Sequence, residues 1–210
     1  MAQQQRGFHT LRRPTPRRDA MPSQRRNLYI KQSQALDLLA ENGVPVKESP
    51  TQSGGFSLGV SIDRDSHSPC IVASPTTDPS NSVALSQKFS FPYGRTTFPP
   101  DGREMRAVAA HVGLSVPAQV SSLSALVEKL VGIFMNKEAF VLETNVGTSP
   151  DGGLQVQGAR FGFDDAAYRS SQRQEDIHKL RNKAEEVPEE VEAEKDGIVF
   201  IKYVVHTSPP

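Results

Sequence analysis

The sequence has few of the residues that build disulfide-bonded, redox-active or zinc-bound proteins. Its 210 residues include one cysteine and no tryptophan. A single cysteine, Cys70, excludes an internal disulfide, a CxxC redox pair and a cysteine zinc site. Cys70 lies in the apolar run Pro69-Cys70-Ile71-Val72, which favours a small buried side chain over a catalytic nucleophile.

Long apolar runs are also missing. The most apolar stretch, residues 198–205, has only the length of a strand and is interrupted by Lys202. A membrane-spanning helix needs about 20 consecutive apolar residues. We therefore expect a soluble or peripheral protein with no membrane span. Its length allows one modest domain plus tails and excludes a large multidomain enzyme.

No common catalytic or metal motif is present. The five histidines are scattered, without an HExxH pattern or a pair four residues apart, so we expect no zinc site. Ser61, Asp63 and His67 match no hydrolase spacing, and no nucleophile elbow is found. The sequence therefore predicts no catalytic residue.

Charge is distributed unevenly although the formal net charge is zero. Residues 1–28 contain seven arginines and one acid, so this segment has a formal charge of about +6 and the remainder is acidic. An Arg-rich, acid-poor leader is typical of a mitochondrial transit peptide. The alternative is a basic tail that contacts RNA or an acidic partner.

Several helices and strands can be predicted in the first half of the chain. Residues 29–42 have helical apolar spacing and end before Gly43, and residues 44–55 form a linker. Two short strands are expected at residues 56–63 and 69–73. The proline-rich stretch 74–100 is expected to be an irregular connection.

The middle of the chain combines two helices with a hairpin. A helix is expected to begin with a capping box at Asp101 and Glu104, and an amphipathic helix follows Pro117. Two strands, flanking a Pro-Asp-Gly-Gly turn, form a β-hairpin over residues 139–161. We expect the long helix to pack on this hairpin around Val141 and Val156.

The last part of the chain predicts a further helix over residues 164–183, an acidic surface segment at 184–196 and a buried strand at 197–205. Helices and strands alternate, so the expected fold class is α/β or α+β. The expected organisation is a leader at 1–28, a helix plus linker at 29–55, and a domain at 56–205.

Five segments, in order along the chain, resemble the β subunit of succinyl-CoA synthetase, also called succinate-CoA ligase. The first four begin at Gln24, Ser57, Val127 and Gly152 and read QRRNLYIKQSQALDLLAENGVPV, SLGVSIDRDSHSPCIVAS, VEKLVGIFMNKEAFVLETNV and GGLQVQGARFGFDDAAYR. The fifth, EEVPEEVEAEKDGIVFIKYV, resembles the acidic helix and strand that precede the family's ligase domain. The resemblance is discontinuous and spans most of residues 24–204.

This resemblance implies an ATP-grasp fold, in which two α/β subdomains clamp a nucleotide. Between Pro50 and Phe56, however, the sequence has only linker residues where the family has most of its first subdomain. Gly54 and Gly55 therefore cannot form the phosphate cradle, which requires several converging N–H groups and a cation. The chain also ends at Pro210, before the ligase domain.

The resemblance also implies a magnesium site, formed by an asparagine and an aspartate on the two hairpin strands. Asn145 occupies the first of these positions, which makes it a vestigial ligand position. The partner position is Gly158, which has no side-chain oxygen, so we expect no metal and no cofactor. Asp164 and Asp165 are poor substitutes because adjacent residues point apart.

These departures predict a non-catalytic structural subunit of a complex in the mitochondrial matrix. The first hypothesis is a reduced ATP-grasp-like protein of the mitochondrial ribosome, its small subunit before its large one, with ribosomal proteins and rRNA as partners. The alternative is a truncated regulatory β-like subunit that pairs with the α subunit of succinate-CoA ligase. A third possibility is an incomplete gene model.

Overall fold

The computed structural model describes residues 27–47, 55–164, 173–181, 188–196 and 198. It contains a mixed α/β fold, as the sequence predicts, around one six-stranded sheet in the order β1-β6-β5-β2-β3-β4. Every neighbouring pair of strands is antiparallel. The strands are β1 (Asn27–Tyr29), β2 (Phe56–Asp63), β3 (Ser68–Ser74), β4 (Gln87–Ser90), β5 (Ala139–Thr148) and β6 (Leu154–Asp164). The helices are α1 (Gln32–Glu41), α2 (Pro79–Ser82), α3 (Arg103–His111), α4 (Pro117–Asn136), α6 (Glu175–Lys179) and α7 (Pro188–Lys195).

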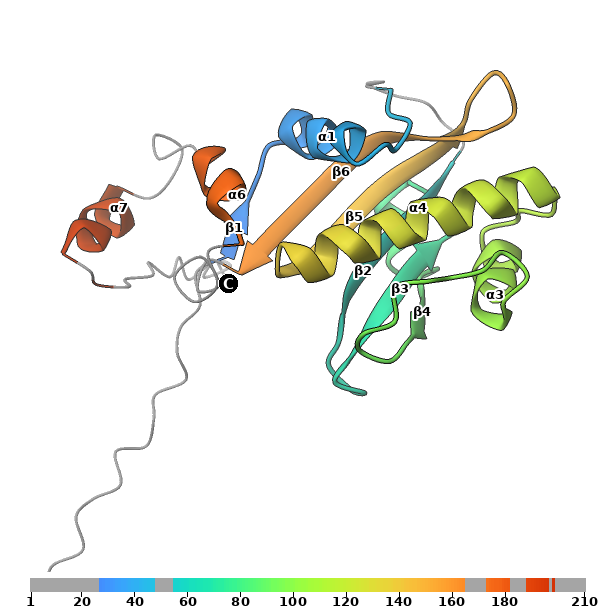
Figure 1. Cartoon of the computed structure of the whole chain (residues 1–210), viewed down its shortest axis with the longest axis horizontal. Coiled ribbons are helices and arrows are strands. Elements are labelled where there is room, and N and C mark those ends of the chain that lie inside the picture. The colour runs from blue at the N-terminus through green and yellow to red at the C-terminus, as the bar shows by residue number, and fades with distance from the viewer. Residues whose placement is uncertain (1–26, 48–54, 165–172, 182–187, 197, 199–210) are drawn as a thin grey trace, which may run out of the picture.

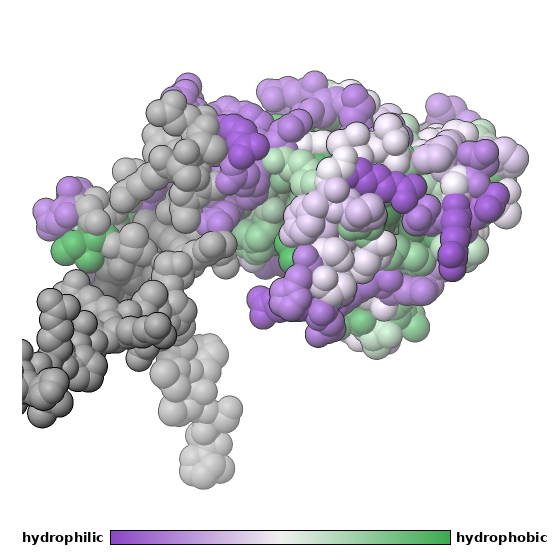
Figure 2. Space-filling model, turned by 60° about the horizontal axis from the view of Figure 1, so that its bottom comes forward, coloured by the Kyte–Doolittle hydropathy of each residue, from purple (hydrophilic) through white to green (hydrophobic). Residues whose placement is uncertain are grey.

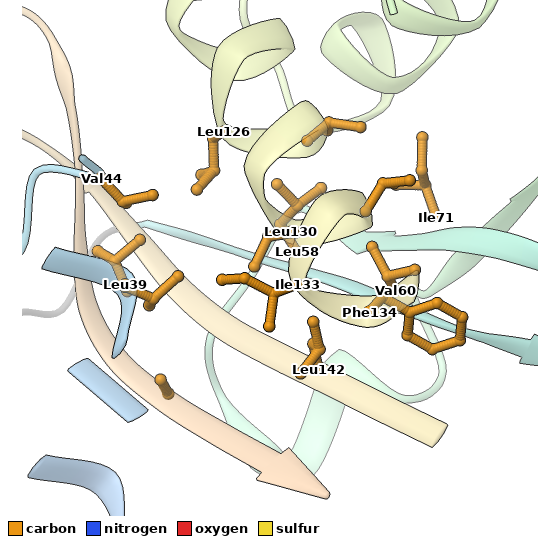
Figure 3. Close-up of a cluster of buried hydrophobic side chains, with 14 of the residues drawn as sticks. Leu39, Val44, Leu58, Val60, Ile71, Leu126, Leu130, Ile133, Phe134 and Leu142 are labelled. Atoms are coloured by element: carbon orange, nitrogen blue, oxygen red, sulfur yellow. The ribbon is translucent and has the colours of Figure 1, made fainter. Parts of the chain in front are cut away.

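The core lies between one face of the sheet and helices α1, α3 and α4 (Figure 1). Alternate residues of the strands point into this core, because side chains on a strand alternate between its two faces. Figure 3 shows the centre of the cluster, where apolar side chains from α1, α4 and the sheet meet. Its labelled members are Leu39, Val44, Leu58, Val60, Ile71, Leu126, Leu130, Ile133, Phe134 and Leu142.

Helix α4 is the long amphipathic helix that the sequence predicts. It begins at Pro117. Eight of its residues, including Leu126 and Leu130, are buried. By length and composition α4 could cross a membrane, but its apolar side chains are those of the core. Among the described residues no other helix passes this test of length and apolarity.

The hairpin of β5 and β6 forms as expected. The Ser149 N–H donates to the Gly153 carbonyl, and Gly152 adopts a φ of 84°, a conformation that a glycine allows without strain. Val156 is fully buried beneath the helices. Val141 is not part of this core: its side chain lies on the opposite face of the sheet, because buried Leu142 and Thr144 fix the alternation of β5.

The expected capping box of α3 is wrong. The N-cap is Gly102, without a side-chain cap, and the Glu104 carboxylate instead accepts hydrogen bonds from both terminal nitrogens of Arg95, at 2.9 and 3.2 Å. A bidentate pair with an arginine is a stronger interaction than a neutral capping bond. The Arg95–Glu104 pair holds the start of α3 against the connection that precedes it.

That connection, residues 74–100, is more ordered than the sequence suggests. It contains α2 and β4, and near its end lies the fully buried Phe98. Two side chains of α4 hold the Phe98 backbone: Glu128 accepts its N–H at 2.8 Å, and the Ser124 hydroxyl donates to its carbonyl. The connection is therefore pinned to the core by a buried ring and two hydrogen bonds.

The C-terminal predictions are met only in part. The expected helix over 164–183 is described only in part: Asp164 belongs to β6, α6 spans Glu175–Lys179, and residues 165–172 and 182–183 lie outside the described residues. Gln34 of α1 donates to the Leu180 carbonyl, which ties this segment to the domain. Helix α7 lies within the predicted acidic segment. The strand expected at 197–205 lies outside the described residues, apart from Ile198.

Candidate functional site

The face of the sheet that points away from the helical layer contains a groove of about 570 Å³. Small and polar side chains of β2, β5 and β6 form its floor, because the apolar residues between them face the core. The α2 segment contributes hydroxyl groups and the exposed Val83 to the rim. The residues that line the groove include Gln32, Ser57, Glu143, Asn145, Gly158 and Arg160.

Asn145 and Gly158 lie directly opposite each other on β5 and β6. The register of the two strands shifts at this point, between Asn145 and Val146, so that Gln157 is an extra residue on β6. Such a bulge bends the strand and redirects the adjacent side chains. The two positions that the family resemblance implies for a magnesium ion therefore face the same corner of the groove.

Gly158 leaves a space that two carboxamides approach. An ideal Cβ built on Gly158 would stand 3.3 Å from Asn145 Nδ2 and 3.4 Å from Gln32 Oε1. Gln32 is the first residue of α1, and no motif in the sequence marks it as a site residue. No pattern in the sequence connects it to Asn145, because α1 reaches this corner only through the packing of α1 against β6.

Magnesium does not fit this set of side chains. It prefers oxygen ligands that include one or two carboxylates. The corner offers only neutral amides, and no group of three or more His, Cys, Asp or Glu side chains with metal-binding geometry occurs among the described residues. Asp164 lies six positions farther along β6, opposite Asn27, or about 20 Å away at the usual rise of a strand. Asp165 lies outside the described residues.

The charges in the groove neutralise one another. Arg160 is bound to Glu143 at 3.1 Å across the β5–β6 pair. The guanidinium carbon of Arg160 also lies 4.6 Å from the centre of the Tyr29 ring, and Tyr29 contacts Phe140 edge to face. These contacts hold the Arg160 side chain against the Tyr29 ring. Figure 2 shows one face of the molecule, on which hydrophilic residues (purple) lie beside smaller apolar areas (green).

The remaining candidate residues do not assemble into a site. Cys70 is a buried free thiol, as predicted, and burial raises its pKa. Asp63 carries an ion pair to Lys88 at 2.7 Å and accepts hydrogen bonds from Ser66, and these contacts hold its pKa well below the usual range. His67 lies in the β2–β3 turn, where it adopts a φ of 51°.

Comparisons with known proteins agree with the family resemblance. No family model matches the chain. The mitochondrial β subunit of ADP-forming succinate-CoA ligase from Saccharomyces cerevisiae is 29% identical over 207 residues, which is 93% of this chain and 47% of the relative. The β subunit from Sulfurovum is 30% identical over 172 residues, 78% of this chain and 41% of the relative. The Neurospora crassa mitochondrial β subunit is 38% identical over 98 residues, 46% of this chain and 21% of the relative.

The similarity is partial in length. The chain spans less than half of each of these relatives. Among solved structures, ATP citrate lyase from Methanosaeta concilii covers 70% of this chain and 33% of its own, with a TM-score of 0.42 and 12% identity. A structural similarity with this TM-score does not identify the fold of the chain. In sequence, the chain is similar to part of the β subunits of succinate-CoA ligase.

Proposed function

We propose that this protein is a β-like subunit of a mitochondrial succinate-CoA ligase assembly and does not itself bind a magnesium nucleotide. The observation that carries the proposal is the similarity to the yeast β subunit, which runs over 207 residues and 93% of the chain. A protein related over nearly its whole length to one subunit of an enzyme is best placed beside the other subunit, here the α subunit. The ATP-grasp-like assignment of the domain belongs to the same proposal.

The groove supports the non-catalytic part of the proposal. A nucleotide's phosphates are usually bound through a magnesium ion held by carboxylates. Gly158 faces Asn145 where the family resemblance implies an aspartate. Glu143, the one acid among the described residues that line the groove, is bound to Arg160. Among the residues that the structure describes, no carboxylate is therefore placed to hold the ion in this corner.

The short connection between α1 and β2 also supports the non-catalytic part of the proposal. Lys47 donates to the Val156 carbonyl, and β2 begins at Phe56. Residues 48–55 are too few to form an α/β subdomain, which requires several strands and helices. The half of the nucleotide clamp that the family resemblance implies at this point has no counterpart between Lys47 and Phe56.

A matrix location is part of the proposal. The Saccharomyces and Neurospora relatives are both named as mitochondrial proteins. The Arg-rich leader of residues 1–28 is consistent with import into the same compartment. The ribosomal hypothesis has no comparable support, since the relatives reported above are ligase subunits, and we replace it with the alternative that pairs the chain with an α subunit.

The proposal is tested by affinity purification of the tagged full chain from mitochondria of its source organism. We expect the ligase α subunit to be enriched at low and high salt, together with ligase activity contributed by an intact β subunit. An unrelated matrix protein with the same tag is the control. Sedimentation of the chain with a ribosomal subunit, without the α subunit, would contradict the proposal and restore the ribosomal hypothesis.

A further inference from the structure

We propose that a second pocket, on the helical side of the sheet, binds a small aliphatic monocarboxylate whose carboxylate lies beside Lys129. The pocket is enclosed by the loop after α1, the first half of α4 and the tip of the β5–β6 hairpin. Its volume is about 420 Å³, which falls within the range of small-molecule sites. This inference goes beyond the proposed function and does not depend on it.

The floor of the pocket is apolar. It is formed by four buried side chains from the loop after α1, α4 and β6, which are Val44, Leu126, Leu154 and Val156. Two of them, Val44 and Leu126, are labelled in Figure 3. A hydrocarbon that settles on this floor is removed from water, which is favourable in proportion to the apolar area buried. The floor therefore fits the body of an aliphatic ligand.

The walls of the pocket are held in place by hydrogen bonds. The Val156 N–H donates to the Pro45 carbonyl at 2.9 Å, and the Lys47 N–H donates to the Val156 carbonyl at 2.8 Å. These two bonds fix the loop after α1 along β6. On the other side, the Gln119 side chain of α4 donates to the Gly152 carbonyl at 3.3 Å, which ties α4 to the tip of the hairpin. The pocket is therefore formed without a ligand, as most small-molecule sites are.

The charges that line the pocket favour an anionic ligand group. Asp151 accepts hydrogen bonds from the Ser149 hydroxyl and the Gly153 N–H, and these bonds lower its pKa and keep it ionised at neutral pH. Lys129 lines the same pocket, is exposed and forms no ion pair among the described residues. A ligand carboxylate therefore gains a partner at Lys129 that the fold leaves unused.

Asp151 also limits how many charges the ligand can carry. Its carboxylate lines the same pocket as Lys129, so a second negative charge on the ligand would be repelled by it. An uncharged ligand of the same length would bind to the floor but would gain nothing from Lys129. The chemistry of the pocket thus favours one carboxylate on an apolar body over a dicarboxylate.

The test is a titration of the full chain with hexanoate, followed by ¹H–¹⁵N nuclear magnetic resonance. We expect saturable shifts of the amide signals of Leu126, Gly153 and Leu154, with a dissociation constant of about 1 mM or tighter. Hexanedioate, which has the same length and a second carboxylate, should bind more weakly. Lys129→Gln should weaken hexanoate by about fivefold, the scale of an ion pair at a surface, and leave the binding of hexan-1-ol unchanged.

Two matched variants of α4 test the location. Ala125 and Ala118 are both exposed on this helix, but of the two Ala125 alone lines the pocket. Ala125→Phe places a ring in the pocket and should abolish hexanoate binding, whereas Ala118→Phe should leave it unchanged. Melting temperatures provide a check on folding, because hexanoate should stabilise the native chain and Ala118→Phe but not Ala125→Phe.

Several results would overturn the inference. These are the absence of a saturable shift in the native chain, binding that survives Ala125→Phe, and shifts confined to the groove around Asn145. An equal loss of hexanoate and hexan-1-ol binding in Lys129→Gln would contradict the role of the charge. None of these measurements uses magnesium, a nucleotide or an α subunit, so the inference and the proposed function can fail separately.

Discussion

At the scale of single residues, Asn145 and Gly158 are site positions that the sequence identifies, whereas Gln32 is not. The family resemblance implies both positions, and the structure places them opposite each other on β5 and β6. Gln32 could not be found in this way. Asn145 and Gly158 are more than a hundred positions away from Gln32 in the sequence. Only the packing of α1 on β6 brings these residues together.

The ion pair of Asp63 and Lys88 predicts how stability depends on pH. Hydrogen bonds from Lys88 and Ser66 lower the pKa of Asp63 in the folded protein. A lowered pKa contributes stability above the unfolded-state value of about 3.9, and this contribution is lost as the pH falls. We expect Lys88→Met to reduce the melting temperature at pH 7 and to make its decline between about pH 5 and pH 2 shallower.

Thermal unfolding followed by circular dichroism at several pH values checks this expectation. Lys47→Met is the control, because Lys47 is exposed and has no ion pair among the described residues. An equal loss of stability at every pH for Lys88→Met would show that Lys88 acts through packing and not through the charge of Asp63.

At the scale of elements, the spacing of apolar residues and the turn residues in the sequence predict most of the long helices and strands in the structure. The apolar stripe of α4 and the turn residues of the hairpin are local signals, and both elements form where expected. The failures arise from contacts that are distant in sequence. Glu104 pairs with Arg95 in place of capping α3, and Val141 faces the groove because the alternation of β5 is set by Leu142 and Thr144.

Helix α4 provides the prediction for this scale. Leu130 is fully buried and packs between the helix and the sheet (Figure 3). Leu130→Ala should lower the free energy of unfolding by about 2 to 5 kcal/mol, the range for leucine truncation in a packed core. Leu126→Ala, one turn earlier, should cost a similar amount, because Leu126 is also buried.

Urea unfolding followed by far-ultraviolet circular dichroism measures these changes, since the chain has no tryptophan to report them. Asn145→Ala is the matched surface variant and should change the stability by less than about 0.5 kcal/mol. If Asn145→Ala were the more damaging change, the groove and not the helical layer would be the feature on which the fold depends.

At the scale of the whole molecule, the leader and the domain meet at β1. Residues 1–26 lie outside the described part, whereas Leu28 is buried and pairs with Phe163. A cut after Leu28 would remove two of the three residues of β1. We therefore predict that any removal of the leader occurs at or before Arg26, and that N-terminal sequencing of the mitochondrial protein finds Asn27 retained. An intact Met1 would instead support a basic tail that stays with the mature protein.

The central claim is that this succinate-CoA ligase β-like chain does not bind a magnesium nucleotide. Calorimetric titration of the full chain with Mg-ATP, and with ATP in the presence of a chelator, tests it most directly. The absence of a carboxylate beside Asn145 predicts no magnesium-dependent binding tighter than about 1 mM, or about 4 kcal/mol of binding free energy. A micromolar dissociation constant that disappears when magnesium is removed would contradict the claim.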